Sequence, residues 1–404
     1  MKGTEAVSTL VLVGTGSRHE TRKENGISHF LEHLLFKGTK KRPNTLSLIE
    51  PLDRVGGAYN AFTGKEYTGF WAKVERSHLD LVLDWVSDIY LNSQLEEKEI
   101  KKEKGVILQE IKMYLDTPIS FIQDLWEKLL YGEHPLGWLT IGREENIRRF
   151  KRKDFLNYKK KHYLSKNTII CVAGNIKSEE VEKKIEKYFR KIELGNSKEK
   201  IKMLENQKKP EALIHFKKTD QTHICLGVRA YDVFHPLKYA QALLATILGG
   251  YMSSRTFISL RVKEGLTYYI KTSSQNMTDT GYLVTQAGVD HQKVEKTINL
   301  ILKEYKKLKT KKIPQKELQK AKDNLRGTLS LALESSDTQA SFYSSQELLT
   351  GKILTPQEQF LEIDKVTVND IFKVAKDIFQ PQKLNLVLIG PFQNKEKFKK
   401  LLKI

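Results

Sequence analysis

Two histidines and a glutamate lie close together near the start of the chain, in the segment His29-Phe30-Leu31-Glu32-His33. Apolar residues recur around them at helical spacing, which predicts a short amphipathic helix. His29 and His33 are four residues apart, so their imidazoles leave the same face of this helix. Two neutral imidazoles can bind Zn²⁺, and a neighbouring carboxylate such as Glu32 can take a proton from a water held by the ion. The pattern by itself more often marks an ordinary amphipathic helix than a zinc site.

A zinc site also needs a third protein ligand, and a second predicted helix, residues 96–116, offers two carboxylates. Glu103 and Glu110 are seven residues apart, which places them on one face, about 10 Å apart along the helix axis. One ion cannot easily bind both, so we expect one to be a ligand and the other to orient a histidine. Both could instead be solvated charges on a polar helix. The apolar neighbours Ile107 and Ile111 argue against this for Glu110.

The order and spacing of these residues resemble the zinc signature of the pitrilysin family, which includes insulin-degrading enzyme and the mitochondrial processing peptidase. The signature is H-x-x-E-H, the inverzincin pattern, and here Glu110 follows it after 76 intervening residues. Other segments are similar to the bacterial and processing-peptidase branch: GSRHE at residues 16–20, FKGT at 36–39 and GGAYNAFT at 56–63. The resemblance covers nearly all of the chain.

The resemblance implies one zinc ion per chain, bound by His29, His33 and Glu110. It also implies that Glu32 is the catalytic general base and that Glu103 supports the catalytic site. A zinc ion with three protein ligands keeps a fourth position for water. Glu32 is then expected to take a proton from this water and to deliver it to the leaving amine.

The resemblance also indicates residues that contact the substrate. Arg261 and Tyr268 lie seven residues apart, where a predicted helix gives way to a strand. In the family a matching arginine and tyrosine reach the bound peptide and the reacting carbonyl, where a cation and a phenol can stabilise an oxyanion. The alternative is a surface arginine and a core tyrosine. Asn60 and Ala61, on a predicted edge strand, are candidates for pairing with the substrate backbone.

An internal repeat predicts how the chain is organised. The 404 residues are more than one core usually serves. Residues 154–174 match residues 370–390 at a constant offset of 216, each running from a helix to a strand that ends in glycine. We therefore predict two homologous α+β domains, each with a mixed or antiparallel sheet packed with helices. They are residues 1–192, with the zinc motif, and residues 211–404, without it, joined by a polar linker at 193–210.

The second domain is expected to have no metal site. Its predicted helix at residues 316–331 matches the helix of Glu103 and Glu110 at an offset of 218, but has Ala321 and Thr328 in their places. The first helix of this half has no H-x-x-E-H sequence. One half of the repeat is therefore predicted to hold a metal and the other half to lack one.

Two departures from the family pattern lie in the first domain. Bacterial members usually have a further strand before the predicted strand at residues 6–16. Its absence indicates a shortened or mis-assigned start and leaves the state of one sheet edge open. The predicted helix at residues 44–55 is expected to be interrupted by Pro51, which is unusual within a helix. Neither departure affects the expected ligands.

Composition excludes several classes of protein. The chain is 39% hydrophobic and 29% charged, and no apolar run approaches the roughly 18 residues that span a membrane. Two cysteines, Cys171 and Cys225, exclude a disulfide scaffold, and without a signal peptide the cytoplasm is expected. The net charge of +20 comes from dispersed lysines and is interpreted as solvated surface. No nucleic-acid motif accompanies it, so we expect no specific nucleic-acid partner.

These features together predict a zinc-dependent endopeptidase that hydrolyses peptides or unfolded polypeptide segments, with Glu32 as general base. The resemblance implies a clamshell chamber of four α+β domains, of which this chain supplies two. We therefore expect a homodimer, or else a heterodimer with a zinc-less homologue. The alternative function is that of a non-catalytic or partner-dependent subunit of a processing-peptidase-like complex. Loss of a zinc-site residue would favour that alternative, and none is lost.

Overall fold

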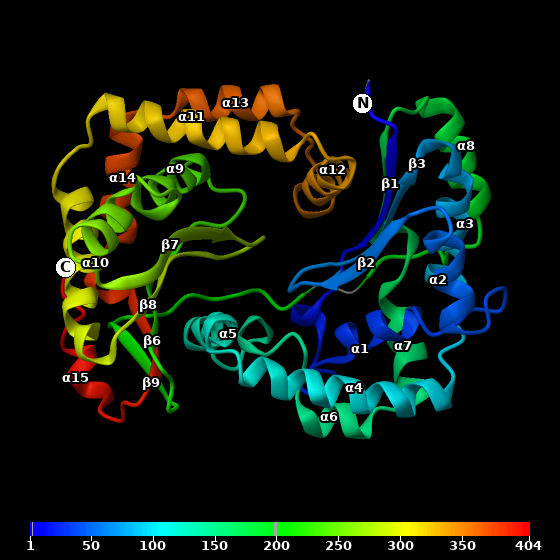
Figure 1. Cartoon of the computed structure of the whole chain (residues 1–404), viewed down its shortest axis with the longest axis horizontal. Helices are drawn as coiled ribbons and strands as arrows, with labels where there is room; N and C mark the ends of the chain where they lie inside the picture. The colour runs from blue at the N-terminus through cyan, green and yellow to red at the C-terminus, as the bar shows by residue number, and fades with distance from the viewer. Residues whose placement is uncertain (2, 198–199) are drawn as a thin grey trace. The chain divides into compact units, whose positions relative to one another are not determined.

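Two β-sheets with helices packed on both faces make up the protein, and Figure 1 shows its computed structural model. The structure describes residue 1, residues 3–197 and residues 200–404. Their Cα positions divide into two compact units. Unit 1 comprises residues 1–113, 138–201 and 331–354, and unit 2 comprises residues 114–137, 202–330 and 355–404.

Within the described residues, the sheet of unit 1 has four strands in the order β2-β3-β1-β4, and all neighbours are antiparallel. The strands are β1 (Ala6–Val13), β2 (Ala58–Thr63), β3 (Thr68–Glu75) and β4 (Thr168–Gly174). The helices are α1 (Ile27–Leu35), α2 (Thr45–Asp53), α3 (Leu79–Asn92), α4 (Glu97–Leu115), α6 (Glu144–Arg149), α7 (Arg152–His162), α8 (Ser178–Phe189) and α12 (Ser336–Thr350). Side chains of β1 alternate between two faces, so Val7 and Val11 enter the larger core and Leu10 and Leu12 a smaller core opposite.

The described part of unit 2 contains a five-stranded sheet in the order β5-β9-β6-β8-β7. Only the pair β5 and β9 is parallel among these neighbours. The strands are β5 (Glu211–Phe216), β6 (Thr222–Ala230), β7 (Thr267–Asn276), β8 (Gly281–Val289) and β9 (Leu384–Gly390). The helices are α5 (Pro118–Tyr131), α9 (Lys238–Gly249), α10 (Val294–Thr310), α11 (Gln315–Ala332), α13 (Pro356–Lys365), α14 (Val368–Ile378) and α15 (Lys395–Lys399).

The predicted fold class, two related α+β units, is confirmed. The repeat appears in the element bounds, because α14 and β9 begin and end 216 residues after α7 and β4. Likewise, α11 begins 218 residues after α4. The sequence offsets therefore mark equivalent elements in the two units.

The two compact units differ from the predicted contiguous domains, 1–192 and 211–404, by one helix each. Each unit includes one helix that comes from the other half of the sequence. α5, from the first half of the sequence, packs on β9 and β6 in unit 2. α12, its counterpart 218 residues later, packs on β1 and β4 in unit 1, where Figure 1 shows it in orange beside the blue β1. Each sheet has a second apolar face that needs a cover, and the helix that covers it comes from the other half of the chain.

The two sheets differ at one edge. In unit 2, β5 pairs with the outer side of β9. In unit 1, no strand among the described residues pairs with the outer side of β4, the counterpart of β9. Pro51 lies inside α2, which continues to Asp53, so the expected interruption of this helix is wrong.

The predicted linker, residues 193–210, forms neither helix nor strand where it is described, and residues 198–199 lie outside the described residues. Its Gln207 side chain is tied to unit 2. The amide donates to the backbone oxygen of Gln382 at 2.8 Å, and its oxygen accepts from Arg229 Nε and Asn385 Nδ2, both at 3.0 Å. This end of the linker is therefore part of unit 2.

None of the helices in the described residues is long and apolar enough to cross a membrane.

The helix exchange makes Trp126 of α5 a test residue for unit 2. Its indole is fully buried and packs edge-on against Tyr282, with 5.9 Å between ring centroids. Trp126→Ala should lower the free energy of unfolding by about 3–5 kcal/mol. It should also speed amide hydrogen exchange in β6 and β9 rather than in β1 and β4. Ile119→Ala in the same helix is the control, because Ile119 is 44% exposed. Faster exchange confined to β1 and β4 would contradict the helix exchange.

Candidate active site

Helix α1 carries His29, Glu32 and His33, and a buried carboxylate holds its start. Glu20 Oε2 accepts hydrogen bonds from the backbone N–H of Gly26 and from Asn25 Nδ2, and Oε1 accepts from the backbone N–H of Ser28, all at 2.9–3.0 Å. A negative charge at this end also complements the helix dipole. Burial raises the pKa of Glu20 to about 7, although these hydrogen bonds oppose the shift. Sequence reasoning missed Glu20, whose one signal was its place in the GSRHE segment.

The structure brings His29, His33 and Glu110 together, from α1 and α4. One possible ligand atom from each lies within 4.8 Å of the others. His29 Nε2 is 3.7 Å from Glu110 Oε1, and His33 Nε2 is 3.6 Å from Glu110 Oε2. These separations suit one zinc ion with bonds of about 2.0–2.2 Å to nitrogen and oxygen.

Two polar atoms of this group, His29 Nδ1 and Glu110 Oε2, are buried and have no hydrogen-bond partner among the described residues. Burial, together with the nearby His33, lowers the pKa of His29 to about 3, so its imidazole is neutral at pH 7. Burial raises the pKa of Glu110, against the influence of His33. A neutral imidazole and an unpartnered carboxylate oxygen fit a divalent cation.

Glu103 is placed differently from Glu110. It is 5% exposed, and its Oε2 lies 3.1 Å from His33 Nδ1. Burial acts against ionisation, but hydrogen bonds from His33 and Lys37 bring the pKa of Glu103 below its usual value. An ionised carboxylate only accepts hydrogen bonds, so His33 Nδ1 carries a proton. Burial acts to lower the pKa of His33, but the hydrogen bond to Glu103 and the charge of Glu110 outweigh it and raise that pKa. Glu103 is therefore placed to orient His33, and Glu110 is the carboxylate that faces both histidines.

Lys37 is a second residue that sequence reasoning missed. Its Nζ lies 2.8 Å from Glu103 Oε1, so both oxygens of this carboxylate are occupied. Lys37 is four residues after His33, within the FKGT segment, and this spacing was the available signal. A lysine at this distance favours the ionised form of Glu103.

Glu32 lies on the same turn of α1 as His33. Thr63 Oγ1, at the end of β2, donates a hydrogen bond of 2.5 Å to Glu32 Oε2. Burial raises the pKa of Glu32, and Glu110 adds to the rise, while Thr63 and His33 oppose it. A half-buried carboxylate with a raised pKa and a fixed orientation is suited to receiving and releasing a proton.

The predicted substrate strand is at a sheet edge. β2 ends the order β2-β3-β1-β4, so the outer side of Asn60 and Ala61 is unpaired within the described part of unit 1. The Asn60 side chain covers part of that edge, because its Oδ1 accepts the backbone N–H of Ala61 at 2.8 Å. An extended peptide that pairs here would replace this local hydrogen bond.

Arg261 and Tyr268 belong to unit 2, whereas the residues described above belong to unit 1. Arg261 is exposed on a π-helical turn, Phe257–Val262, and its guanidinium lies over the Phe257 ring at 5.5 Å. Tyr268 is 77% exposed at an irregularity of β7, so the alternative of a core tyrosine is wrong. Such irregularities are common where a side chain is redirected for function.

The equivalent helices of unit 2 carry no comparable cluster. Ala321 of α11 is fully buried where α4 has Glu103, and Thr328 is exposed where α4 has Glu110. Throughout the described residues, His29, His33 and Glu110 form the single group of three or more potential ligands with this geometry. The residue types at the repeated positions, and not the fold, distinguish the two halves.

Comparison with known proteins identifies matching families and relatives. Residues 2–142 match the family described as Insulinase (Peptidase family M16), and residues 149–325 match the Peptidase M16 inactive domain. An uncharacterized zinc protease of Bacillus subtilis (strain 168), YmxG, is 38% identical over 390 residues, which cover 96% of this chain and 94% of that protein.

Solved structures of related proteins also match this chain over nearly its whole length. The crystal structure of a protease from Helicobacter pylori matches with a TM-score of 0.88 and 25% identity, covering 96% of this chain and 95% of that chain. A peptidase M16 inactive domain from Pseudomonas fluorescens matches with a TM-score of 0.89 over 98% and 95% of the two chains, and at 18% identity it shows the fold alone. Both the sequence and the structural matches extend over nearly the whole chain. The chain belongs to the insulinase family of peptidases, family M16.

Proposed function

We propose that this chain is a zinc-dependent endopeptidase that hydrolyses peptides or unfolded polypeptide segments. The observation that carries the proposal is the meeting of His29, His33 and Glu110 within 4.8 Å, beside Glu32 on the same helix. Membership of a peptidase family, and a relative named as a zinc protease, support the same activity. In this proposal one zinc ion is held per chain by the three residues, and Glu32 is the general base.

The proposed chemistry divides between the ion and the protein. A zinc ion held there would lower the pKa of a water molecule and polarise the carbonyl of a peptide bond. The Glu32 carboxylate accepts the proton of the attacking water and passes it to the leaving nitrogen. Because Thr63 holds Oε2, the other oxygen of Glu32 is available for this proton. The raised pKa of Glu32 brings its acceptance and release of a proton closer to neutral pH.

The two histidines differ in how readily they can bind a cation. His29 is neutral because burial lowers its pKa to about 3. Glu103 fixes the ring of His33 through Nδ1, which directs Nε2 toward Glu110. His29 can therefore bind a cation without first losing a proton, whereas a cation that binds His33 must displace a proton from Nε2 wherever the raised pKa of this ring keeps it charged.

The proposed substrate is an extended peptide added to the free edge of β2. The Ala61 N–H is the first backbone donor available to it, once the Asn60 side chain has turned away. Backbone pairing of this kind selects unfolded segments and tolerates many side chains. We assign to Arg261 and Tyr268 the binding of the peptide and the stabilisation of its oxyanion. The exposure of both side chains supports this assignment.

Assembly and compartment complete the proposal. We propose a homodimer that encloses a clamshell chamber, with a heterodimer of this chain and a zinc-less homologue as the other arrangement. The presence of one metal-bearing and one metal-free unit in the same chain supports a need for further subunits.

We place the enzyme in the cytoplasm, since Cys171 and Cys225 are free thiols, as in a reducing compartment.

The role of Glu32 has a direct test. Glu32→Gln should keep the bound zinc but lower kcat for a set of internally quenched peptides by about 10²–10⁴-fold, since general base catalysis contributes that much. Glu97→Gln, at an exposed position of α4, is the control and should cleave like wild type. If wild type and Glu32→Gln both hold zinc and neither cleaves, the chain is instead a non-catalytic or partner-dependent subunit of a processing-peptidase-like complex.

Removal of the charge of Glu103 or of Glu110, both on α4, should lower the affinity for zinc to different extents. Glu110→Gln should abolish stoichiometric zinc binding, because it replaces a ligand. Glu103→Gln should weaken zinc binding by about 10–100-fold, as expected for a residue that orients a ligand. Competition with a chromophoric chelator measures both affinities. A larger loss in Glu103→Gln than in Glu110→Gln would reverse the proposed roles.

A further inference from the structure

The loop of residues 36–44 joins α1 to α2 and contains a polar cluster that the zinc signature does not include. Lys37, which contacts Glu103 at 2.8 Å, lies near the start of this loop. Although α1 ends at Leu35, the Lys37 N–H still donates to the Leu34 carbonyl at 3.1 Å, so the end of the helix holds one side of Lys37. The conformation of the loop sets the other side.

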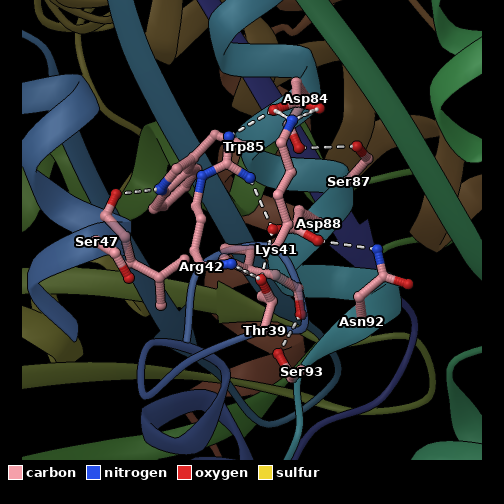
Figure 2. A network of polar contacts seen from close by, with 12 residues as sticks. Thr39, Lys41, Arg42, Ser47, Asp84, Trp85, Ser87, Asp88, Asn92 and Ser93 are labelled. Carbon is pink, nitrogen blue, oxygen red and sulfur yellow. Dashed lines mark hydrogen bonds and ion pairs between the residues drawn. The ribbon is translucent and has the colours of Figure 1, made fainter. Parts of the chain in front are cut away.

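Figure 2 shows the polar cluster that holds this loop against α3. Arg42 Nη1 lies 2.7 Å from Asp88 Oδ2, and Arg42 Nη2 lies 2.5 Å from Asp84 Oδ2. Thr39 Oγ1 donates to the same Asp88 oxygen at 2.6 Å. We name Thr39, Arg42, Asp84 and Asp88 the loop clamp. One arginine thus joins the loop to two carboxylates that lie one turn apart on α3.

The backbone of the loop is closed on itself at the same point. The Thr39 N–H donates to the Arg42 carbonyl at 2.7 Å, and the Arg42 N–H donates to Thr39 Oγ1 at 2.9 Å. Beyond α3, the Gln94 N–H donates to the Gly38 carbonyl at 3.0 Å, and Gln94 Nε2 donates to the Thr39 carbonyl at 2.9 Å. Thr39, two residues after Lys37, is therefore held from two sides.

Three of the four loop-clamp residues are buried, which separates the loop clamp from an ordinary surface ion pair. Arg42 is 7% exposed, Asp88 is 4% exposed and Thr39 is inaccessible. The other Asp88 oxygen accepts from Asn92 Nδ2 at 2.9 Å, so this carboxylate is satisfied on both sides. Burying charges is costly, and a buried pair is weak support for stability by itself. The buried contacts instead fix the position of the loop relative to α3.

A continuous set of contacts runs from the loop clamp to the proposed metal ligands. Arg42 and Thr39 hold the loop, Lys37 extends from the loop to Glu103, and Glu103 contacts His33 at 3.1 Å. Partners of this kind, which act behind a ligand, alter metal affinity substantially in other proteins. The loop clamp stands one step further from the ion than Glu103 and Lys37.

We propose that the loop clamp positions Lys37 against Glu103 and so fixes the orientation in which His33 meets the metal. Arg42, Asp84 and Asp88 are positioning residues in this proposal, and none touches the substrate. The inference rests on the proposed zinc site. It predicts that breaking the loop clamp weakens zinc binding through Lys37 and not through general loss of folding.

The test uses the full chain and Zn²⁺, with affinity and dissociation rate measured by a chromophoric chelator. Arg42→Lys keeps the charge but loses the planar fork that reaches both carboxylates. It should weaken zinc binding by about 10–100-fold, as should Lys37→Met. The double variant should be no weaker than Lys37→Met alone, because the loop clamp acts through Lys37. Asp84→Asn, at a carboxylate 26% exposed, replaces Arg42→Lys if that variant does not fold.

Asp80→Asn is the matched control. Asp80 lies in the first turn of α3 and pairs with Lys184 of α8, away from the loop. It should leave zinc binding unchanged. A lower melting temperature of the metal-free Arg42→Lys protein with wild-type zinc affinity would overturn the inference and leave a structural role. Additive losses in the double variant would also overturn it. If wild type itself binds no zinc, the proposed function and this inference both fail. If wild type binds zinc and Arg42→Lys binds it equally well, only this inference fails.

Discussion

Helix α1 is nine residues long, and isolated helices shorter than about 12–15 residues are marginal in water. The positions of His29, Glu32 and His33 on this helix therefore depend on what holds the helix from outside. Ile27, Phe30, Leu31 and Leu34 are almost completely buried and attach one face to the core of unit 1. Glu20 satisfies the N–H groups at its start. Burial of one face leaves the opposite face, with both histidines, turned toward α4.

The site then depends on unequal surroundings for two similar carboxylates. Glu103 and Glu110 come from one helix, yet Glu103 is saturated by His33 and Lys37 while Glu110 Oε2 has no hydrogen-bond partner in the described part of the chain. The saturated carboxylate is suited to orienting a ring, and the other to binding a cation. Environment and not residue type separates the two roles, as is common for paired acids in active sites.

Comparison of the two units shows that the fold does not require the residues of the proposed metal site. Unit 2 repeats the helices and strands of unit 1, but a buried Ala321 stands where unit 1 has Glu103. The same sheet and helices pack well without a metal cluster. The exchange of α5 and α12 then joins the two halves, because each sheet covers its second apolar face with a helix from the other half.

The sequence by itself determined the parts that depend on local spacing. Residues four apart share a helix face, so the pairing of His29 and His33 followed from the chain alone, and the offset of 216 revealed two related α+β units. Only the tertiary structure decided which carboxylate Lys37 reaches, that Glu20 holds the start of α1, and which sheet α5 covers. Periodicity states which face of an element is apolar, but not which distant surface it meets. That choice is made by packing between segments far apart in the chain.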